Sequence, residues 1–306
     1  MFLVKWSRLR PALILFMLAS LLLVACGSSL GNESWPGLST DGEKIYLANG
    51  TTVSSYFATD QSLAWTYPAE PQANQLFFAA PSVEGGRVIF GDYGVAGGFF
   101  SPGVTVSVHA VENVENGGAA PIKWTQSADI NDKIVAPPLQ VGDRVFVGTA
   151  DNFVLALDAT NGQPLWDFET GHSIWGQPAF RDGVLFVTSM DRTIYALEAE
   201  TGEELWRASF AGAIAAGPVL NDDLVYVSDF DSQVHALDIN SGEEQWAVSA
   251  ENWIWGAPAY ADNVLYYADI EGNVFAVDAM TGEEVWQART PGAVQTSPAV
   301  ADDIVY

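Results

Sequence analysis

The chain has 306 residues, of which 38 are acidic and 12 are basic, so its formal net charge is −26 at pH 7. Such a charge disfavours binding to nucleic acid and to anionic lipid head groups, because their phosphates would be repelled. Cys26 is the only cysteine, which excludes an intramolecular disulfide and a metal site built from several cysteines.

The first 25 residues have the pattern of a secretory signal peptide. Three basic residues precede an apolar run over 12–25 that is too short to span a membrane comfortably. The sequence Leu-Val-Ala-Cys at 23–26 resembles the bacterial lipobox, in which the cysteine is acylated and becomes the first residue after cleavage. We therefore predict a signal peptide over 1–25, lipid attachment at Cys26, and an exported protein anchored to a membrane that faces the periplasm or the cell exterior. The alternative is a cysteine that lies by chance near an ordinary cleavage site.

A repeat occupies most of the remaining chain. Residues 26–34 are rich in Gly, Ser and Asn and predict a short flexible tether. Beyond it, the pattern Ala-x-Asp/Glu-x-x-x-Gly-x-x-x-Trp recurs four times at a spacing of 40 residues, which indicates a repeat architecture. The acid, glycine and tryptophan of the four copies are Asp158, Gly162, Trp166, Glu198, Gly202, Trp206, Asp238, Gly242, Trp246, Asp278, Gly282 and Trp286.

Within one repeat, turn signals separate four short apolar segments. In the last full repeat we expect strands at Ala257–Tyr260, Val264–Ala268, Val274–Asp278 and Glu284–Ala288. Four antiparallel strands in about 40 residues form the blade of a β-propeller. We therefore predict an all-β fold, a β-propeller of four-stranded antiparallel blades over 35–306, with six complete blades and the start of a seventh. The given sequence ends at Tyr306, before the position where the motif tryptophan of a seventh blade would lie. We therefore expect a C-terminally incomplete domain and seven or eight blades in the intact protein.

Each motif residue has an expected structural task. The acid accepts hydrogen bonds from the following turn, the glycine supplies a positive φ, and the tryptophan lies on the outermost strand and packs between blades. The pattern resembles the tryptophan-docking motif of quinoprotein-type propellers, the pyrroloquinoline quinone (PQQ)-like repeat family. Together with the lipobox, the chain resembles the BamB-like lipoproteins of this family. That resemblance implies a role in the assembly of outer-membrane β-barrel proteins, if the cell has an outer membrane.

The same family contains quinone-dependent dehydrogenases, so an enzyme is the rival class. The sequence has no pair of adjacent cysteines, no Cys-x-x-Cys-His haem attachment site, and no catalytic aspartate that stands apart from the repeat. Asp151, Asp191, Asp231 and Glu271 recur every 40 residues in one turn, which favours turn chemistry over calcium binding. We predict no catalytic residue, no cofactor and no metal. A PQQ-binding dehydrogenase, or another small-ligand or carbohydrate binder that uses the central funnel, stays as the alternative.

The residues that break the repeat are the candidates for function, because the repeat does not require them. They lie in the loops that lead into the first strand of each blade, which rim the central channel of a propeller. The candidates are Trp175, Trp253, Trp255, His172 and Gln295. Exposed aromatic side chains there predict a surface for another protein. The alternative is that the indoles plug the funnel as packing.

A Gly-rich insertion in the second blade, 92–102, contains Phe99 and Phe100 and is either a second partner-binding loop or a flap over the blade edge. Taken together, these features predict a monomeric, non-catalytic, lipid-anchored propeller that serves as a protein interaction scaffold at the cell envelope. Its expected partner is the barrel-assembly machinery if an outer membrane exists.

Overall fold

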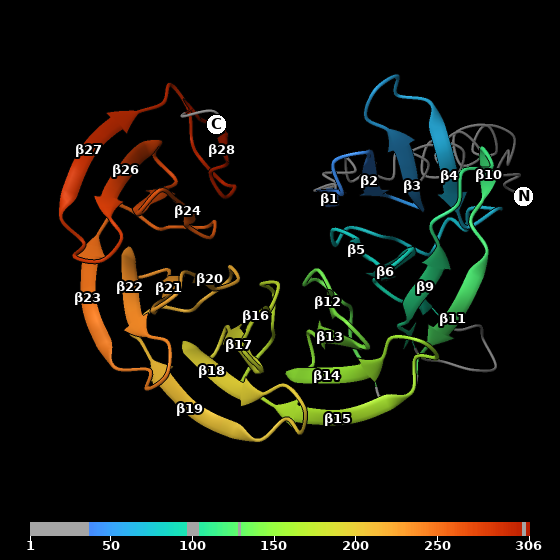
Figure 1. Ribbon diagram of the computed structural model, residues 1–306, viewed down its shortest axis with the longest axis horizontal. Helices are drawn as coiled ribbons and strands as arrows, with labels where there is room; N and C mark the ends of the chain where they lie inside the picture. The colour runs from blue at the N-terminus through green and yellow to red at the C-terminus, as the bar shows by residue number, and fades with distance from the viewer. Residues whose placement is uncertain (1–36, 97–103, 128–129, 302–303) are drawn as a thin grey trace, which may run out of the picture. The chain divides into compact units, whose positions relative to one another are not determined.

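The computed structural model describes residues 37–96, 104–127, 130–301 and 304–306. The predicted signal peptide, the lipidation site Cys26 and the tether lie outside these residues, as do Phe99 and Phe100. The described residues form an all-β structure in which successive sheets follow one another along the chain (Figure 1). No helix long and apolar enough to cross a membrane is found among the described residues.

The described part of the chain contains six antiparallel sheets of four strands, and we number these blades in chain order. Blade 1 contains β1 (Gly37–Thr40), β2 (Lys44–Asn49), β3 (Thr52–Phe57) and β4 (Leu63–Tyr67). Blade 2 contains β5 (Ser82–Glu84), β6 (Arg87–Gly91), β9 (Val108–Glu112) and β11 (Ile122–Gln126). Blade 3 contains β12 (Leu139–Val141), β13 (Arg144–Gly148), β14 (Phe153–Asp158) and β15 (Pro164–Glu169).

The next three blades repeat this plan closely. Blade 4 contains β16 (Ala179–Arg181), β17 (Val184–Ser189), β18 (Thr193–Glu198) and β19 (Glu204–Ser209). Blade 5 contains β20 (Val219–Leu220), β21 (Leu224–Ser228), β22 (Gln233–Asp238) and β23 (Glu244–Ser249). Blade 6 contains β24 (Ala259–Ala261), β25 (Val264–Ala268), β26 (Asn273–Asp278) and β27 (Glu284–Arg289).

Three short additions accompany the blades. A fifth strand, β10 (Gly118–Ala119), pairs parallel with β4 and so joins blade 2 to the outer edge of blade 1. The insertion of blade 2 includes a hairpin of β7 (Val95–Ala96) and β8 (Val104–Thr105). After blade 6, β28 (Val300–Ala301) pairs with β29 (Ile304–Val305), which matches the predicted start of a seventh blade. The predicted propeller architecture is confirmed.

The strand boundaries differ slightly from those predicted in blade 6. The second strand, Val264–Ala268, agrees with the prediction, but the first strand begins at Ala259 rather than at Ala257. Pro258 precedes it, and a proline lacks the amide that a strand ladder uses. The third strand, β26, begins one residue earlier than predicted, at Asn273, whose amide donates to Asp269 Oδ1.

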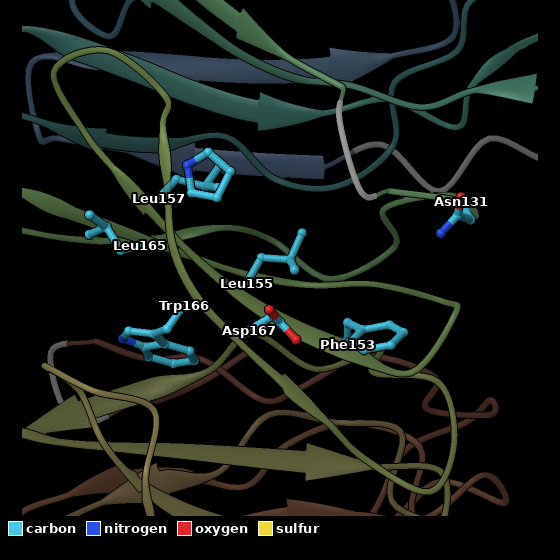
Figure 2. Close-up of a pocket in the computed structure, with 8 residues that line it drawn as sticks. Asn131, Phe153, Leu155, Leu157, Leu165, Trp166 and Asp167 are labelled. Carbon is cyan, nitrogen blue, oxygen red and sulfur yellow. The ribbon is translucent and has the colours of Figure 1, made fainter.

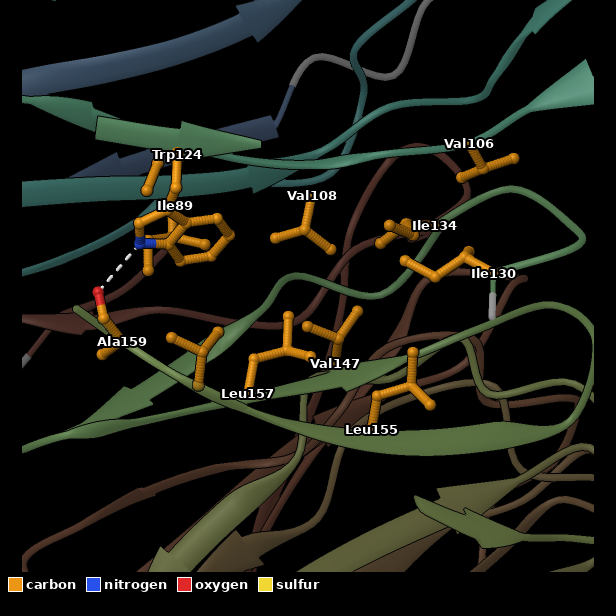
Figure 3. Close-up of a cluster of buried hydrophobic side chains, with 12 residues drawn as sticks. Ile89, Val106, Val108, Trp124, Ile130, Ile134, Val147, Leu155, Leu157 and Ala159 are labelled. Carbon is orange, nitrogen blue, oxygen red and sulfur yellow. Dashed lines mark hydrogen bonds between the residues drawn. The ribbon is translucent and has the colours of Figure 1, made fainter. Parts of the chain in front are cut away.

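The hydrophobic core lies between neighbouring blades. The cluster in Figure 3 combines side chains of blade 2, such as Ile89 and Val108, with side chains of blade 3, such as Val147 and Leu157. The other clusters likewise join blade 1 to 2, 3 to 4, 4 to 5, and 5 to 6. Middle strands such as β14 are therefore buried on both faces, whereas the outermost strands of blades 3 to 5 contain only exposed and half-buried residues.

The motif tryptophan joins each blade to the next one. Trp166 Nε1 of blade 3 donates to the carbonyl oxygen of Ala199 in blade 4 at 3.1 Å, and Trp206 makes the same bond to Ile239 at 3.2 Å. The indole also lies against the motif glycine of the following blade. A Cβ at Gly202 would lie 2.6 Å from Trp166 Cε3, so the glycine provides space as well as its positive φ.

Candidate functional site

An aromatic stack of three rings forms on the lead-in loop of blade 6. Phe230 lies in the turn between β21 and β22 of blade 5, and its ring stacks against both predicted tryptophans of the loop that follows that blade. The ring centroids are 5.2 Å apart for Phe230 and Trp255, with an interplanar angle of 27°, and 6.2 Å apart for Phe230 and Trp253, with an angle of 22°. We call Phe230, Trp253 and Trp255 the aromatic stack.

The lead-in loop that carries the two tryptophans is held at several points. Ile254, between them, is buried. The carbonyl oxygen of Trp253 accepts the amide of Ile270 at 2.9 Å, and the carbonyl oxygen of Gly256 accepts the hydroxyl of Ser228 at 2.9 Å. The backbone on both sides of the exposed rings is therefore fixed, and an aromatic group on a fixed backbone loses little freedom when a partner binds.

The turn that carries Phe230 is fixed by a buried carboxylate. Asp229 Oδ1 accepts the amides of Asp231 and Gln233, both at 3.0 Å, and its Oδ2 accepts the amide of Gly212 at 3.1 Å. Burial by itself raises the pKa of Asp229, but hydrogen bonds and the nearby His235 outweigh it, so the pKa lies below its usual value. In this turn the role predicted for Asp231 is therefore taken by Asp229, two residues earlier.

The other candidate residues lie elsewhere. His172 and Trp175 are exposed in the lead-in loop of blade 4, where His172 Nδ1 accepts the amide of Ser173 at 2.8 Å. Gln295 is exposed beyond blade 6, where it lines a cavity together with Trp286 and Tyr306. The structure thus brings together Trp253 and Trp255, whereas His172 and Trp175 lie in the lead-in loop of blade 4 and Gln295 lies in a third loop.

Two polar clusters were missed by sequence reasoning, and one of them anchors the insertion of blade 2. Asp92 is fully buried, and its Oδ2 accepts Nε2 of Gln75 at 3.0 Å and lies 3.0 Å from His109 Nε2. On the other side of the imidazole, Nδ1 lies 3.0 Å from the hydroxyl of Tyr67. Burial alone raises the pKa of Asp92, but bonds from His109, Gln75 and the amide of Ser107 lower it overall.

The second cluster surrounds His235, which the sequence marks only as a filler of a strand position used by Tyr195 and Phe275. Its Nδ1 lies 2.7 Å from Glu244 Oε2, and its ring lies 4.2 Å from that of Phe210 in the preceding loop. Its Nε2 is 3.6 Å from Asp229 Oδ2, which is beyond hydrogen-bond distance, so this pairing is electrostatic. Burial lowers the pKa of His235, but the two carboxylates outweigh it and raise the pKa overall.

Cavities open beside several blades, and two of the larger ones lie at blades 3 and 6. The first, of about 370 Å³, lies on blade 3, and its lining includes Phe153, Leu155 and Leu157, with Asn131 and Asp167 as polar neighbours (Figure 2). The second, of about 580 Å³, lies between blade 6 and the final strand pair, and Arg289 is part of its lining. Within the described residues, no three His, Cys, Asp or Glu side chains are arranged to hold a metal ion.

The fold and the docking contacts define a class of protein: a β-propeller whose blades are joined by a motif tryptophan that packs on the glycine of the next blade. The family described as "Outer membrane protein assembly factor BamB" matches residues 120–174, 154–252 and 231–306, which together span more than half of the chain. The chain therefore belongs to this family. A search of curated proteins found no match to the sequence.

Solved structures share the fold. BamB from Moraxella catarrhalis superimposes with a TM-score of 0.69 at 19% identity, covering 87% of this chain and 79% of that one. The computationally designed Ika8 protein has a TM-score of 0.61 at 15% identity, covering 90% and 93%. Saccharomyces cerevisiae Sqt1 has a TM-score of 0.69 at 12% identity, covering 85% and 74%. At these identities the similarity shows the propeller fold alone.

The two cavities do not fit PQQ, the quinone for which this repeat is named. The quinone bears three carboxylates, and buried anionic groups require cationic or hydrogen-bonding partners. Among the described lining residues, the first cavity offers no basic side chain and the second offers only Arg289. We therefore derive no reaction step through a quinone.

Proposed function

We propose that this protein is a non-catalytic, lipid-anchored scaffold that binds another protein at the cell envelope through the loops leading into the first strands of its blades. The observation that carries the proposal is the aromatic stack. Trp253 is 55% exposed although it stacks on Phe230. An exposed tryptophan that stacks on half-buried aromatic rings and lies on a fixed backbone is typical of a binding hot spot.

Trp175 extends the proposed surface to the lead-in loop of blade 4, where its side chain is 37% exposed. The family supports a partner among the proteins that assemble outer-membrane β-barrels, if the cell has an outer membrane. Anchoring through Cys26 would keep these loops close to the membrane in which such a partner resides. His172 and Gln295 are proposed as secondary contacts, and Phe99 and Phe100 as contacts from the insertion.

Affinity capture from the cell's own membranes tests the proposal. We expect the lipidated protein to retain a barrel-assembly protein or another defined envelope complex, identified by mass spectrometry. The double variant Trp253→Ala, Trp255→Ala is expected to lose that partner, whereas Leu205→Ala, an exposed apolar residue on the outer strand β19, is expected to keep it. An identical partner set for all three proteins would exclude the aromatic stack as the interface.

A second experiment addresses the anchor and the rival enzymatic class. Cys26→Ser is expected to move the protein from the membrane fraction to the soluble fraction. Purified protein incubated with PQQ and calcium is expected to show no bound quinone spectrum and no dye-coupled oxidation of alcohols or sugars. A quinone spectrum accompanied by turnover would replace the scaffold with a dehydrogenase.

A further inference from the structure

The aromatic stack lies in a part of the chain that has no lysine or arginine, and His235 is its one other basic side chain. No lysine or arginine lies between Arg207 and Arg289, that is, over residues 208–288. The same stretch contains fourteen aspartates and glutamates and comprises nearly all of blades 5 and 6. Whatever contacts these two blades therefore meets a surface whose side-chain charges are almost all negative.

Three of these acids are close to the stack in the chain or next to a residue that pairs with it. Asp231 follows Phe230 directly, Glu251 precedes Trp253 by two residues, and Glu271 follows Ile270, whose amide binds the Trp253 carbonyl oxygen. All three side chains are exposed. In the part of the chain that the structure describes, none of the three takes part in an ion pair.

Aromatic faces and carboxylates select the same kind of ligand. The π-face of an indole is negative and attracts a cation placed over the ring, and Trp is the best of the aromatic side chains in this respect. The planar guanidinium of arginine also stacks on such a face and pairs with a carboxylate through two parallel N–H groups, a planar geometry that the ammonium of lysine lacks. An anionic segment would be repelled, and an uncharged sugar would lack the long-range attraction that the carboxylates exert on a cation.

We propose that the aromatic stack receives arginine side chains of an extended basic segment of the partner protein, with Asp231, Glu251 and Glu271 pairing with the same segment. This inference rests on the proposed scaffold function and specifies the chemistry of the partner. Trp253 supplies the exposed ring face, while Phe230 and Trp255 hold the stack in place. The carboxylates attract the basic segment from a distance and set its orientation.

A peptide series tests this directly on the purified protein. The probes are fluorescein-labelled octapeptides that alternate glycine with arginine, with lysine or with glutamate, and binding is followed by fluorescence anisotropy at low and at moderate salt. We expect the arginine peptide to bind more tightly than the lysine peptide and the glutamate peptide not to bind. Trp253→Ala is expected to lower the affinity for the arginine peptide about three- to tenfold, which is the range for losing a cation contact over an indole face.

Two controls separate the stack from the overall charge. Leu205→Ala should leave binding of the arginine peptide unchanged, and the double variant Asp231→Asn, Glu251→Gln should weaken binding mainly at low salt. Each variant is first checked for an unchanged urea midpoint, and Trp253 is chosen over the less exposed Trp255 because its truncation disturbs less packing. Equal binding of arginine and lysine peptides together with no effect of Trp253→Ala would overturn the proposal, as would competition by an uncharged hexasaccharide.

The peptide assay and the membrane capture together separate a failure of the basic-segment proposal from a failure of the scaffold function. If Trp253→Ala loses the arginine peptide but retains the envelope partner in membrane capture, the cation site stands and the aromatic stack is not the scaffold interface. If the variant loses the partner but binds the peptide like the unmodified protein, the interface stands and the basic segment is wrong.

Discussion

At the scale of single residues, the motif glycine combines two constraints that a sequence pattern does not separate. Gly202 has a φ of 76°, which disfavours any side chain, and it also faces the indole of Trp166 from the preceding blade. Gly183 has a similar φ of 86°, yet a Cβ there would meet nothing within 4 Å. A comparison of alanine substitutions at these two glycines therefore separates the cost of backbone strain from the cost of displacing the Trp166 indole.

We expect Gly202→Ala to destabilise the protein by about 2 to 5 kcal/mol, since it adds overpacking of about 1 to 3 kcal/mol to a backbone cost of about 1 to 2 kcal/mol. Gly183→Ala is expected to cost about 1 to 2 kcal/mol, the backbone term alone. Urea unfolding followed by tryptophan fluorescence measures both. Equal losses in the two variants would mean that the glycine is needed only for its φ.

His235 provides a prediction about pH. Its pKa is raised in the folded protein, above an ordinary value of about 6.5, by Glu244 and Asp229. A raised folded-state pKa contributes stability that is fully present below the unfolded-state pKa and is lost as the pH rises through the folded-state pKa. This contribution should therefore be complete at about pH 5.5 to 6 and absent at strongly alkaline pH.

We compare the unfolding free energy of the protein with that of His235→Phe, which keeps an aromatic ring where Phe275 lies in the next blade. The difference between the two proteins is expected to be larger at pH 6 than at pH 8.5. His109 and His172 are present in both proteins, so their titration cancels in the comparison. A difference that does not change with pH would show that folding leaves the pKa of His235 unchanged.

At the scale of the blade, the docking tryptophans are equivalent in sequence but not in surroundings. Trp206 is half-buried, packs on Gly242 and donates a hydrogen bond to Ile239 of blade 5. Trp286 has the same position in blade 6 but is 37% exposed. The contribution of a docking tryptophan is therefore set by the blade that follows it.

Trp206→Ala is expected to lower the free energy of unfolding by about 3 to 5 kcal/mol, as for other buried aromatic truncations. Trp286→Ala is expected to cost clearly less, because the indole leaves a smaller cavity when it is already partly solvated. Chemical unfolding of both variants measures the contrast. A loss of less than about 1 kcal/mol for Trp206→Ala would contradict the docking role.

The sequence predicted the blades well because each blade is a local unit. Turn acids such as Asp158 and strand runs such as Val264–Ala268 depend on near neighbours in the chain, so a 40-residue period reveals them. The contacts between blades are not local. The steric role of Gly202 depends on Trp166, and the aromatic stack depends on Phe230, whose counterparts one repeat away, Met190 and Ile270, are not aromatic.

The polar clusters illustrate the same limit. Asp92, Gln75 and Tyr67 come from three separated segments that meet at His109 only when blades 1 and 2 pack together. Spacing in the sequence contains no signal for such a meeting. The residue type at position 92 gives no hint either, because Asp229 and Asp269 take the same place after β21 and β25 as Asp92 takes after β6.

At the scale of the whole molecule, the uneven charge distribution makes stability depend on salt. Two unit charges about 10 Å apart in water repel by about 0.4 kcal/mol. The screening length is about 30 Å at 0.01 M salt and about 8 Å at 0.15 M. The fourteen acids of residues 208–288, with no lysine or arginine among them, therefore repel one another over several neighbours at low salt and far less at moderate salt.

We expect the urea midpoint to rise when NaCl is increased from about 0.01 M to about 0.15 M, with a gain of about 1 kcal/mol or more from screened repulsion. Urea is the suitable denaturant because guanidinium would itself screen the charges. Ion pairs such as Lys44 with Glu115, at 2.7 Å, would be weakened by the same change and oppose the gain. Since exposed pairs contribute little and acids exceed bases by 26, repulsion should prevail, and a falling midpoint would show that the ion pairs dominate instead.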